Sequence, residues 1–269
     1  MNLFTSDLDR TLIFSERTID KDEIERICIE QLDGQNISYV TRAIQTRLTE
    51  IHENMQFVPV TTRSRAQFER IILFQRDIVP EIAVVANGGM ILRNGEVDAV
   101  WQAHIEQTLQ SLPLQVDDLQ QHFHEQLAAP YFLRHQRVDG LFFVYIVDLA
   151  QLDEAALQAL REQLAQLGWD SYLHGRKFYI VPHSITKGAA VRYLKEQAEY
   201  ERHYAAGDSL MDVSMMYLAD RSFAPLHGEI VEHPESYRQI EIIEKKGAAF
   251  AEQCLGEILS SFSRKSSVL

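Results

Sequence analysis

Four short apolar runs, each followed at once by polar residues, constrain the fold of this chain more than any other feature of its sequence. They span residues 2–6, 57–61, 82–86 and 203–206, and helical patterns separate them. Continuous apolar runs of this length are typical of parallel strands that are buried on both faces of a sheet. The alternation of such strands with helices predicts the α/β class, with a Rossmann-like parallel sheet as the core.

Apolar residues recur at helical spacing between these strands and near the end of the chain. The last of these segments carries an apolar stripe that docking onto the core explains. A dimer contact is the alternative, so we expect a monomer or a homodimer. A hairpin is expected over 27–40, with its turn at Asp33-Gly34. The expected helices are 41–54, Ser64 (as N-cap) to Phe74, 187–197 and 244–262.

The pattern changes between Met90 and Pro182, where strands paired through hairpins alternate with helices. This arrangement predicts an inserted α+β domain, with Asn87-Gly88-Gly89 as the hinge into it. We therefore expect a core of residues 1–89 and 183–269 and an inserted domain of residues 90–182. The expected elements of that domain are helices 107–127 and 152–167 and strands 131–134, 142–147, 169–173 and 177–181.

The acidic composition argues against several classes of partner. With 26 basic and 39 acidic residues, the formal net charge is −13, which disfavours binding to nucleic acid or to an anionic membrane. The two cysteines, Cys28 and Cys254, cannot build a disulfide framework. The start of the chain does not resemble a signal peptide, and no apolar run reaches the length of a membrane span. We therefore expect a cytoplasmic protein that does not associate with membranes.

Polar side chains gather where the predicted strands end. In parallel α/β sheets, ligands bind beyond the carboxyl ends of the strands, so we expect these side chains at one rim. Carboxylates brought together there repel each other unless a cation lies between them or one of them is protonated. Each residue alone has a simpler interpretation, such as a solvated turn for the Asp7 and Asp9 pair. The candidates are Asp7, Asp9, Thr61, Lys187, Asp208 and Asp212.

These residues resemble the four motifs of the haloacid-dehalogenase-like (HAD) superfamily of Mg²⁺-dependent phosphatases. The resemblance covers the whole chain, and the first and fourth motifs are the specific ones. The insertion lies between the second and third motifs, where the sucrose-phosphate-phosphatase and phosphomannomutase-like branch carries a large α+β cap of the C2 type. The motifs are Asp7-Leu8-Asp9-Arg10-Thr11-Leu12, Thr61, Lys187 and Gly207-Asp208-Ser209-Leu210-Met211-Asp212.

The resemblance implies catalytic roles for four residues. Asp7 is expected to be the nucleophile that forms an aspartyl-phosphate. Asp9 is expected to protonate the leaving alkoxide and then to take a proton from the attacking water. Thr61 and Lys187 are expected to hold the oxygens of the transferring phosphoryl group.

The resemblance also implies a Mg²⁺ cofactor. Its ligands would be the carboxylates of Asp7 and Asp208 and the backbone carbonyl of Asp9, while Asp212 would support the metal or its waters. Mg²⁺ prefers oxygen ligands in octahedral geometry and keeps several waters. Clustered carboxylates also need such a cation in order to coexist.

Three residues of the motifs are candidates for substrate binding. Arg10 and Thr62 stand where the family usually has Gly, and Arg63 follows directly. Arg10 either points to solvent or reaches the substrate, and Arg63 either contacts the substrate or pairs with a carboxylate. None of these departures removes a catalytic group, so we expect an active enzyme.

The expected function is that of a Mg²⁺-dependent phosphatase acting on a small phosphorylated metabolite, with a phosphosugar as the favoured class. A phosphomutase of the same fold is the second interpretation, because it uses the same nucleophile but returns the phosphoryl group to the sugar. The third is a non-catalytic HAD-like module that binds a nucleotide or a protein partner. The intact set of motif residues argues against this third interpretation.

Overall fold

The computed structural model describes residues 1–19 and 25–263, and the chain divides into two compact units. The first contains Met1–Val97 and the chain from Lys187 onward, and the second contains Asp98–Thr186. Each unit has its own hydrophobic core. Residues 90–97, which we expected at the start of the inserted domain, group with the first unit, and residues 183–186, which we expected in the core, group with the second.

The first unit is built on a parallel sheet of five strands, which confirms the predicted α/β class. Leu3 in β1 is in register with His203 in β12 on one side and with Gln56 in β4 on the other. All four residues of β1 are buried, as expected for a strand that is covered on both faces. In spatial order the strands are β14 (Glu241–Ile243), β13 (Arg221–Pro225), β12 (His203–Ala206), β1 (Leu3–Ser6) and β4 (Gln56–Pro59).

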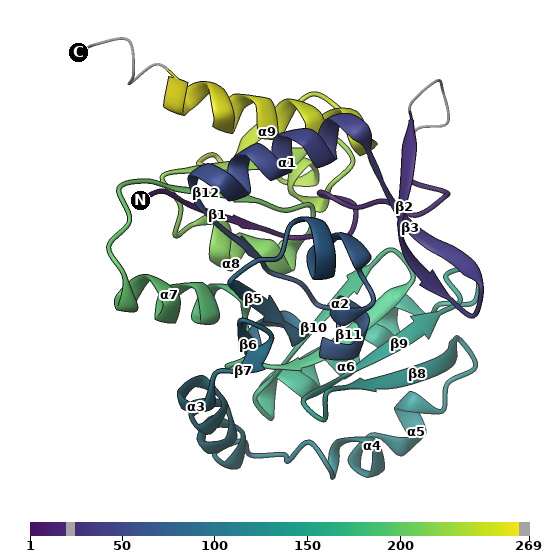
Figure 1. The fold of residues 1–269 in the computed structure, drawn as a ribbon. Coiled ribbons are helices and arrows are strands. Elements are labelled where there is room, and N and C mark those ends of the chain that lie inside the picture. Colours follow the sequence, from purple (N-terminus) through teal and green to yellow (C-terminus); the bar gives the residue numbers. More distant parts are fainter. Residues whose placement is uncertain (20–24, 264–269) are drawn as a thin grey trace. The chain divides into compact units, whose positions relative to one another are not determined.

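Helices cover both faces of this sheet, with α1 and α9 on one face and α7 and α8 on the other (Figure 1). Thr41 caps α1 by accepting a hydrogen bond from the backbone N–H of Ile44 at 3.1 Å. The apolar stripe of α9 is buried in the core of the unit, so docking accounts for it. The helices are α1 (Arg42–Asn54), α7 (Lys187–Gln197), α8 (Val213–Met216) and α9 (Gly247–Ser263).

The strand predicted over 82–86 extends the sheet in an irregular way. β5 (Ile82–Val85) meets the edge of the sheet through a parallel bridge between Val60 and Val84. It also pairs antiparallel with β6 (Met90–Arg93), which continues into β7 (Glu96–Val97). β6 and β7 thus form a hairpin that is built onto the first unit.

The helix expected from Ser64 to Phe74 is not continuous. Ser64 does cap a helix, α2 (Arg65–Glu69), through a reciprocal capping box with Gln67. That helix is short, and a separate π-helical turn follows over Leu73–Asp77. Phe74 lies in this turn and packs against aromatic rings of the core, so tertiary packing prevails here over the regular helical pattern.

The predicted hairpin is formed by β2 (Arg26–Leu32) and β3 (Gln35–Thr41). The turn residues Asp33 and Gly34 have φ angles of 51° and 75°, which is the left-handed geometry of a tight hairpin turn. The hairpin brings one carboxylate, Glu30, into complete burial. A buried charge of this kind must be paired, and its partners belong to the candidate site.

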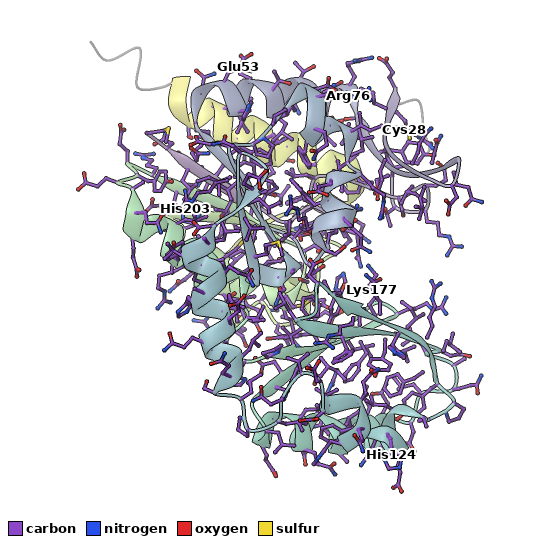
Figure 2. The ribbon with its side chains drawn as sticks, turned by 60° about the horizontal axis from the view of Figure 1, so that its bottom comes forward. Cys28, Glu53, Arg76, His124, Lys177 and His203 are labelled. Atoms are coloured by element: carbon purple, nitrogen blue, oxygen red, sulfur yellow. The ribbon has the colours of Figure 1, made fainter. Side chains whose placement is uncertain are left out.

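The second unit is an antiparallel four-stranded sheet with helices, so the insertion is an α+β domain as predicted. Trp169 is fully buried and donates a hydrogen bond from Nε1 to the carbonyl of Leu114 at 3.0 Å. Lys177, at the start of β11, and His124, in α5, are labelled in Figure 2. In spatial order the strands are β10 (Trp169–His174), β11 (Lys177–Pro182), β9 (Phe142–Val147) and β8 (Phe132–Val138).

The prediction of one helix over 107–127 is wrong. A helix begins earlier, after Asp98, whose carboxylate accepts hydrogen bonds from the backbone N–H groups of Val100 and Trp101. It ends before Pro113, because proline has no N–H to donate and its ring blocks the preceding turn. The helices of the unit are α3 (Ala99–Gln110), α4 (Leu119–His122), α5 (His124–Leu127) and α6 (Glu154–Gln166).

The helices of both units are too short or too polar to span a membrane, as judged on residues 1–19 and 25–263.

Candidate active site

A buried lysine links two of the predicted carboxylates at the rim of the parallel sheet. Asp7 directly follows β1, Asp212 lies in the turn after β12, and Lys187 is the first residue of α7. Lys187 Nζ lies 2.5 Å from Asp7 Oδ1 and 2.5 Å from Asp212 Oδ1. All three side chains are buried. The structure therefore joins residues from opposite ends of the sequence into one ion-pair cluster.

Burial and charge act in opposite directions in this cluster. Burial raises the pKa of Asp7 to about 6, the Lys187 ammonium opposes this rise, and the Asp212 carboxylate adds to it. Burial by itself lowers the pKa of Lys187, but the carboxylates of Asp212 and Asp7 outweigh it and hold that pKa above its ordinary value. Lys187 is therefore held in its charged form. The pKa of Asp7 stays above its ordinary value even with this cation beside it.

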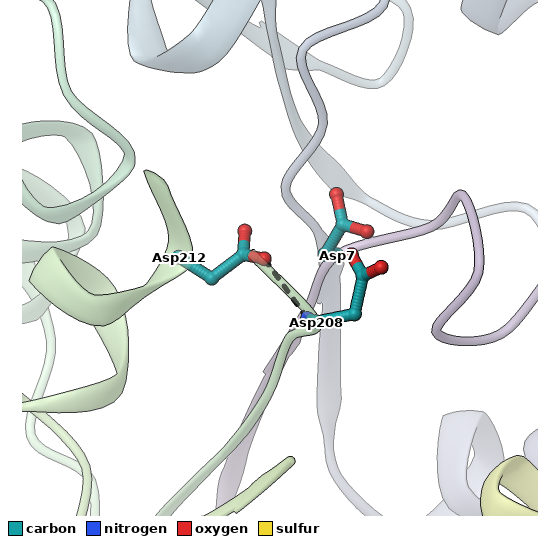
Figure 3. A group of neighbouring side chains, drawn as sticks. All are labelled: Asp7, Asp208 and Asp212. Carbon is teal, nitrogen blue, oxygen red and sulfur yellow. Dashed lines mark hydrogen bonds between the residues drawn. The ribbon is translucent and has the colours of Figure 1, made fainter. Parts of the chain in front are cut away.

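The carboxylates of Asp7, Asp208 and Asp212 form a group that could hold a metal ion (Figure 3). One oxygen atom from each of them lies within 4.8 Å of the others. A buried set of carboxylate oxygens suits a hard divalent cation such as Mg²⁺. The donor set therefore fits the cofactor that the sequence implies.

Asp212 also organises the loop on which Asp208 stands. Its Oδ2 accepts hydrogen bonds from the backbone N–H groups of Asp208 and Ser209 at 3.0 and 2.9 Å, and from the Ser209 hydroxyl at 2.8 Å. Because its other oxygen accepts the Lys187 ammonium, Asp212 has structural contacts on both sides. This suits a supporting role for Asp212.

Gly207 is required where Asp212 packs against the backbone. A Cβ atom added at Gly207 would lie 2.3 Å from Asp212 Cβ and 2.6 Å from its Cγ. We expect Gly207→Ala to lower the free energy of unfolding by about 1–3 kcal/mol through overpacking. Displacement of the loop should also lower activity by on the order of 10²-fold. Urea unfolding and phosphate release measure the two effects.

Gly256→Ala is the matched control for this change. Gly256 lies inside α9, and its added Cβ would approach Arg47 Cζ no closer than 4.0 Å. Alanine is the better helix former by about 1 kcal/mol, so we expect this variant to be at least as stable as the wild type and fully active. Equal effects of the two substitutions would contradict the packing argument at Gly207.

A second cluster surrounds Asp9. Arg63 binds the Asp9 carboxylate through two hydrogen bonds, Nε to Oδ2 at 2.7 Å and Nη2 to Oδ1 at 2.8 Å. The same guanidinium donates from Nη1 to Glu30 Oε2 at 2.7 Å. Arg70 and Ser38 also donate to Glu30. Of the two alternatives for Arg63, the structure therefore has it paired with a carboxylate.

The sequence did not identify Glu30, Ser38 or Arg70 as parts of the site. Its one signal was a charged residue, Glu30, inside an otherwise β-prone run of the predicted hairpin. The Asp9 carboxylate is 44% exposed, whereas Arg63 is 10% exposed and Glu30 is fully buried. The contact thus anchors a half-exposed carboxylate to a buried ion-pair network on the β2–β3 hairpin.

The two threonines after β4 lie at the same rim as Asp7. Val60 donates its backbone N–H to Ser6 O at 2.7 Å, so the ends of β4 and β1 are side by side. Thr61 is fully buried, and its Oγ1 accepts a hydrogen bond from the backbone N–H of Arg63 at 3.2 Å. Thr62, which lies between Thr61 and Arg63 in the sequence, is half-buried.

Arg10 faces the carboxylates of the rim. Its Nε lies 3.2 Å from Asp208 Oδ2, and its Nη2 donates to the carbonyl of His227 at 2.9 Å. The expectation that Arg10 either points to solvent or reaches the substrate did not include this ion pair. His227 was also missed, because no sequence pattern relates it to the first motif.

The chain belongs to the HAD superfamily of phosphatases, and solved structures of a sucrose-phosphatase and of a haloacid dehalogenase-like hydrolase share its fold. Within this superfamily the chain belongs to the sucrose-6F-phosphate phosphohydrolase family, whose model matches residues 1–224. This is a family of phosphoric monoester hydrolases, so the predicted class of enzyme is confirmed. Comparison with curated protein sequences gave no match.

Several solved structures share the fold over nearly the full length of the chain. The sucrose-phosphatase of Synechocystis sp. PCC6803, solved with sucrose and phosphate, has a TM-score of 0.65 at 15% identity and covers 98% of this chain and 97% of its own. A trehalose-6-phosphate phosphatase related protein has a TM-score of 0.57 at 16% identity, covering 98% and 99%. A haloacid dehalogenase-like hydrolase from Bacteroides thetaiotaomicron has a TM-score of 0.57 at 14% identity, covering 96% and 99%.

Proposed function

We propose that the protein is a Mg²⁺-dependent phosphatase that hydrolyses a small phosphorylated sugar through an aspartyl-phosphate on Asp7. The observation that carries this proposal is the buried Asp7 carboxylate at the end of β1, paired with Lys187 and grouped with Asp208. The family model and the sucrose and phosphate in the Synechocystis structure support a sugar phosphate as the substrate class.

Asp7 and Asp9 divide the reaction into two displacements. An Asp7 carboxylate oxygen attacks phosphorus, the bond from phosphorus to the sugar oxygen breaks, and Asp9 gives its proton to the leaving alkoxide. Water then attacks the aspartyl-phosphate, Asp9 takes a proton from that water, and inorganic phosphate leaves with the Asp7 carboxylate restored. The Asp9 side chain is half-exposed and pairs with Arg63 as a carboxylate, which is the form that takes a proton from water.

Positive charge is needed where the phosphoryl group transfers. Lys187 is buried 2.5 Å from Asp7, so its ammonium would hold an oxygen of the phosphoryl group that Asp7 attacks. Thr61 would add a hydroxyl from the end of β4. Mg²⁺ would be held by the carboxylates of Asp7 and Asp208 and the carbonyl of Asp9, and when bound it supplies electrostatic stabilisation of the transferring group.

We propose that Arg63 positions Asp9 and that Thr62 remains a candidate for substrate contact. The bidentate contact from Arg63 fixes the plane of the Asp9 carboxylate. Glu30 and its partner Arg70 hold the guanidinium in turn. The β2–β3 hairpin thereby supports the proposed acid and base.

Substitution of Arg63 by lysine tests this positioning role. Lysine keeps the charge but cannot make two parallel hydrogen bonds to one carboxylate. We expect kcat to fall by about 10–100-fold, with a much smaller change in KM, because the proton-transferring group is misplaced. Arg65→Lys is the control, since Arg65 pairs with the exposed Glu69 on α2. A rise in KM alone would assign Arg63 to substrate binding instead.

A screen of phosphorylated metabolites with Mg²⁺ tests the proposed function. We expect the wild type to release inorganic phosphate from one or more sugar phosphates, and Asp7→Asn to release it far more slowly. An isomerised sugar phosphate with little free phosphate would indicate the phosphomutase instead. No turnover, together with no trapping of beryllofluoride or vanadate by the wild type, would indicate the non-catalytic module. A cytoplasmic location and a monomer or homodimer stay predictions of the sequence.

A further inference from the structure

The backbone at Arg10 adopts a conformation that side chains other than glycine rarely take. Its φ angle is +66°, in the left-handed region that costs an L-residue about 1–2 kcal/mol. The residue follows directly on Asp9. Strain of this kind persists where surrounding contacts hold it, and such sites often have a function.

His227 contacts both the side chain and the backbone carbonyl of Arg10. The Arg10 guanidinium donates from Nη2 to the His227 carbonyl at 2.9 Å, and His227 Nε2 lies 2.9 Å from the Arg10 carbonyl. Gly247 donates its backbone N–H to His227 Nδ1 at 3.2 Å. Nδ1 is therefore the acceptor of the ring, so Nε2 carries the proton and donates to Arg10.

The same segment also holds the loop that carries Asp208. Glu229 donates its backbone N–H to the Asp208 carbonyl at 2.8 Å, and its carboxylate accepts the N–H of Leu210 at 2.9 Å. A Cβ atom at Gly228 would lie 2.6 Å from that same carbonyl. Residues 227–229 thus fix Arg10 and Asp208 in a common frame, so their contact is part of the fold.

Within this frame the Arg10 guanidinium lies against a carboxylate of the metal-binding group. Arg10 Nε is 3.2 Å from Asp208 Oδ2, with the Asp208 side chain 3% exposed and that of Arg10 34% exposed. A guanidinium at this distance satisfies part of the negative charge that a metal ion would otherwise satisfy. It also repels a second cation that approaches the same oxygens.

We propose that Arg10 is a resident counter-ion of Asp208 that competes with Mg²⁺ for this carboxylate. Without metal, the guanidinium offsets the negative charge of the Asp208 carboxylate. Because its charge repels Mg²⁺, it also lowers the affinity of the site for the ion. The inference rests on the proposed Mg²⁺ site and concerns its affinity. It assigns Arg10 to the metal carboxylate and not to the substrate.

Calorimetric titration of the full chain with MgCl₂, without substrate, tests the inference. Arg10→Gln removes the charge, whereas Arg10→Lys keeps it, and both variants retain a side chain at the strained φ angle. We expect Arg10→Gln to bind Mg²⁺ about 2–5-fold more tightly than the wild type, as removal of one partly exposed ion pair predicts. Arg10→Lys should bind within about twofold of the wild type.

Thermal unfolding provides the second measurement and shows whether each variant folds. Arg10→Gln should have a lower Tm than the wild type without metal and a larger rise in Tm with MgCl₂. Arg42→Gln is the charge control, because Arg42 is exposed and pairs with Glu25 away from the rim. This control should bind Mg²⁺ as the wild type does.

The possible outcomes separate this inference from the proposed function. Equal or weaker Mg²⁺ binding by Arg10→Gln would overturn the counter-ion while leaving the phosphatase intact. A raised KM for the sugar phosphate at saturating Mg²⁺, with unchanged Mg²⁺ affinity, would assign Arg10 to the substrate. Absence of Mg²⁺ binding to every variant would overturn the metal site and the counter-ion together.

Discussion

Substitution of Lys187 by methionine is expected to lower the free energy of unfolding by about 3–5 kcal/mol at pH 8 without metal, because it leaves two buried carboxylates without their cation. Lys187 is 1% exposed, and its ammonium lies 2.5 Å from both Asp7 and Asp212. For a chain of this size such a loss corresponds to a fall in Tm of about 10 °C. Urea unfolding and thermal unfolding measure it directly.

The pH dependence of this loss identifies its electrostatic origin. Without the ammonium, protonation is the remaining way to relieve the repulsion between the carboxylates of Asp7 and Asp212. The folded variant therefore takes up protons more readily than its unfolded chain, and its deficit should shrink as the pH falls from 8 to 5. MgCl₂ should also reduce the deficit, because a bound cation replaces part of the missing charge.

Lys195→Met is the matched control on the same helix. Lys195 is half-buried in α7 and donates to the carbonyl of Leu218 at 2.6 Å. Loss of this single contact should cost about 1 kcal/mol, with no change in the deficit between pH 8 and pH 5. If the two lysine variants lost equal stability at pH 8, the buried cluster would not be the source of the effect at Lys187.

The ends of the parallel strands could be predicted from the sequence because their pattern is local. The apolar run before Asp7 specifies a buried strand, and the rule that parallel strands end at one rim then brings Asp7 and Asp208 together. Lys187 follows from the same logic, since it opens the helix that returns to the sheet. Short-range pattern and topology together thus account for the first cluster.

The second cluster could not be predicted in this way. The contact of Arg63 with Glu30 depends on how the β2–β3 hairpin folds against the rim, and no periodicity specifies that packing. His227 faces Arg10 across 217 residues of sequence, through a loop that contains no motif. The prediction of helix boundaries failed for a related reason. The turn at Leu73–Asp77 is set by packing around Phe74 and not by helical propensity.

Arg10 could be predicted from the sequence only in part. The sequence marks it as unusual because it stands in the first motif where glycine is common, and the φ angle of +66° explains why glycine suits that position. The contact with Asp208 explains what a charged side chain can do there. The strained backbone, the His227 contacts and the metal carboxylate become one argument only when the coordinates are known.

Asp7→Asn is expected to lower phosphate release by a factor on the order of 10⁴ or more, because removal of a nucleophile abolishes the covalent route. Asparagine has nearly the same shape, and its Oδ1 can still accept the Lys187 ammonium. The variant should therefore fold, and it should not form the acid-stable and hydroxylamine-sensitive phosphoenzyme that we expect of the wild type. Residual activity within tenfold of the wild type would rule out Asp7 as the nucleophile.

The same variant should be more stable than the wild type at high pH without metal. The pKa of Asp7 is about 6 in the folded protein against an ordinary 3.8, so between these values the folded state binds more protons than the unfolded chain. The stability that Asp7 contributes is thus lost as pH rises through about 6. About two pKa units correspond to about 3 kcal/mol, and asparagine, which does not titrate, avoids this loss.

The difference in unfolding free energy between Asp7→Asn and the wild type should therefore grow from pH 4 to pH 7 and then level off. Asp117→Asn is the control for the removal of one carboxylate, because the Asp117 side chain is 81% exposed. MgCl₂ should reverse the order at pH 8, since an ion that binds the folded wild type stabilises it by mass action and the variant has lost one ligand. A difference that stays flat with pH would mean that Asp7 is not held in a carboxylate-destabilising site, and the buried charge cluster would need another explanation.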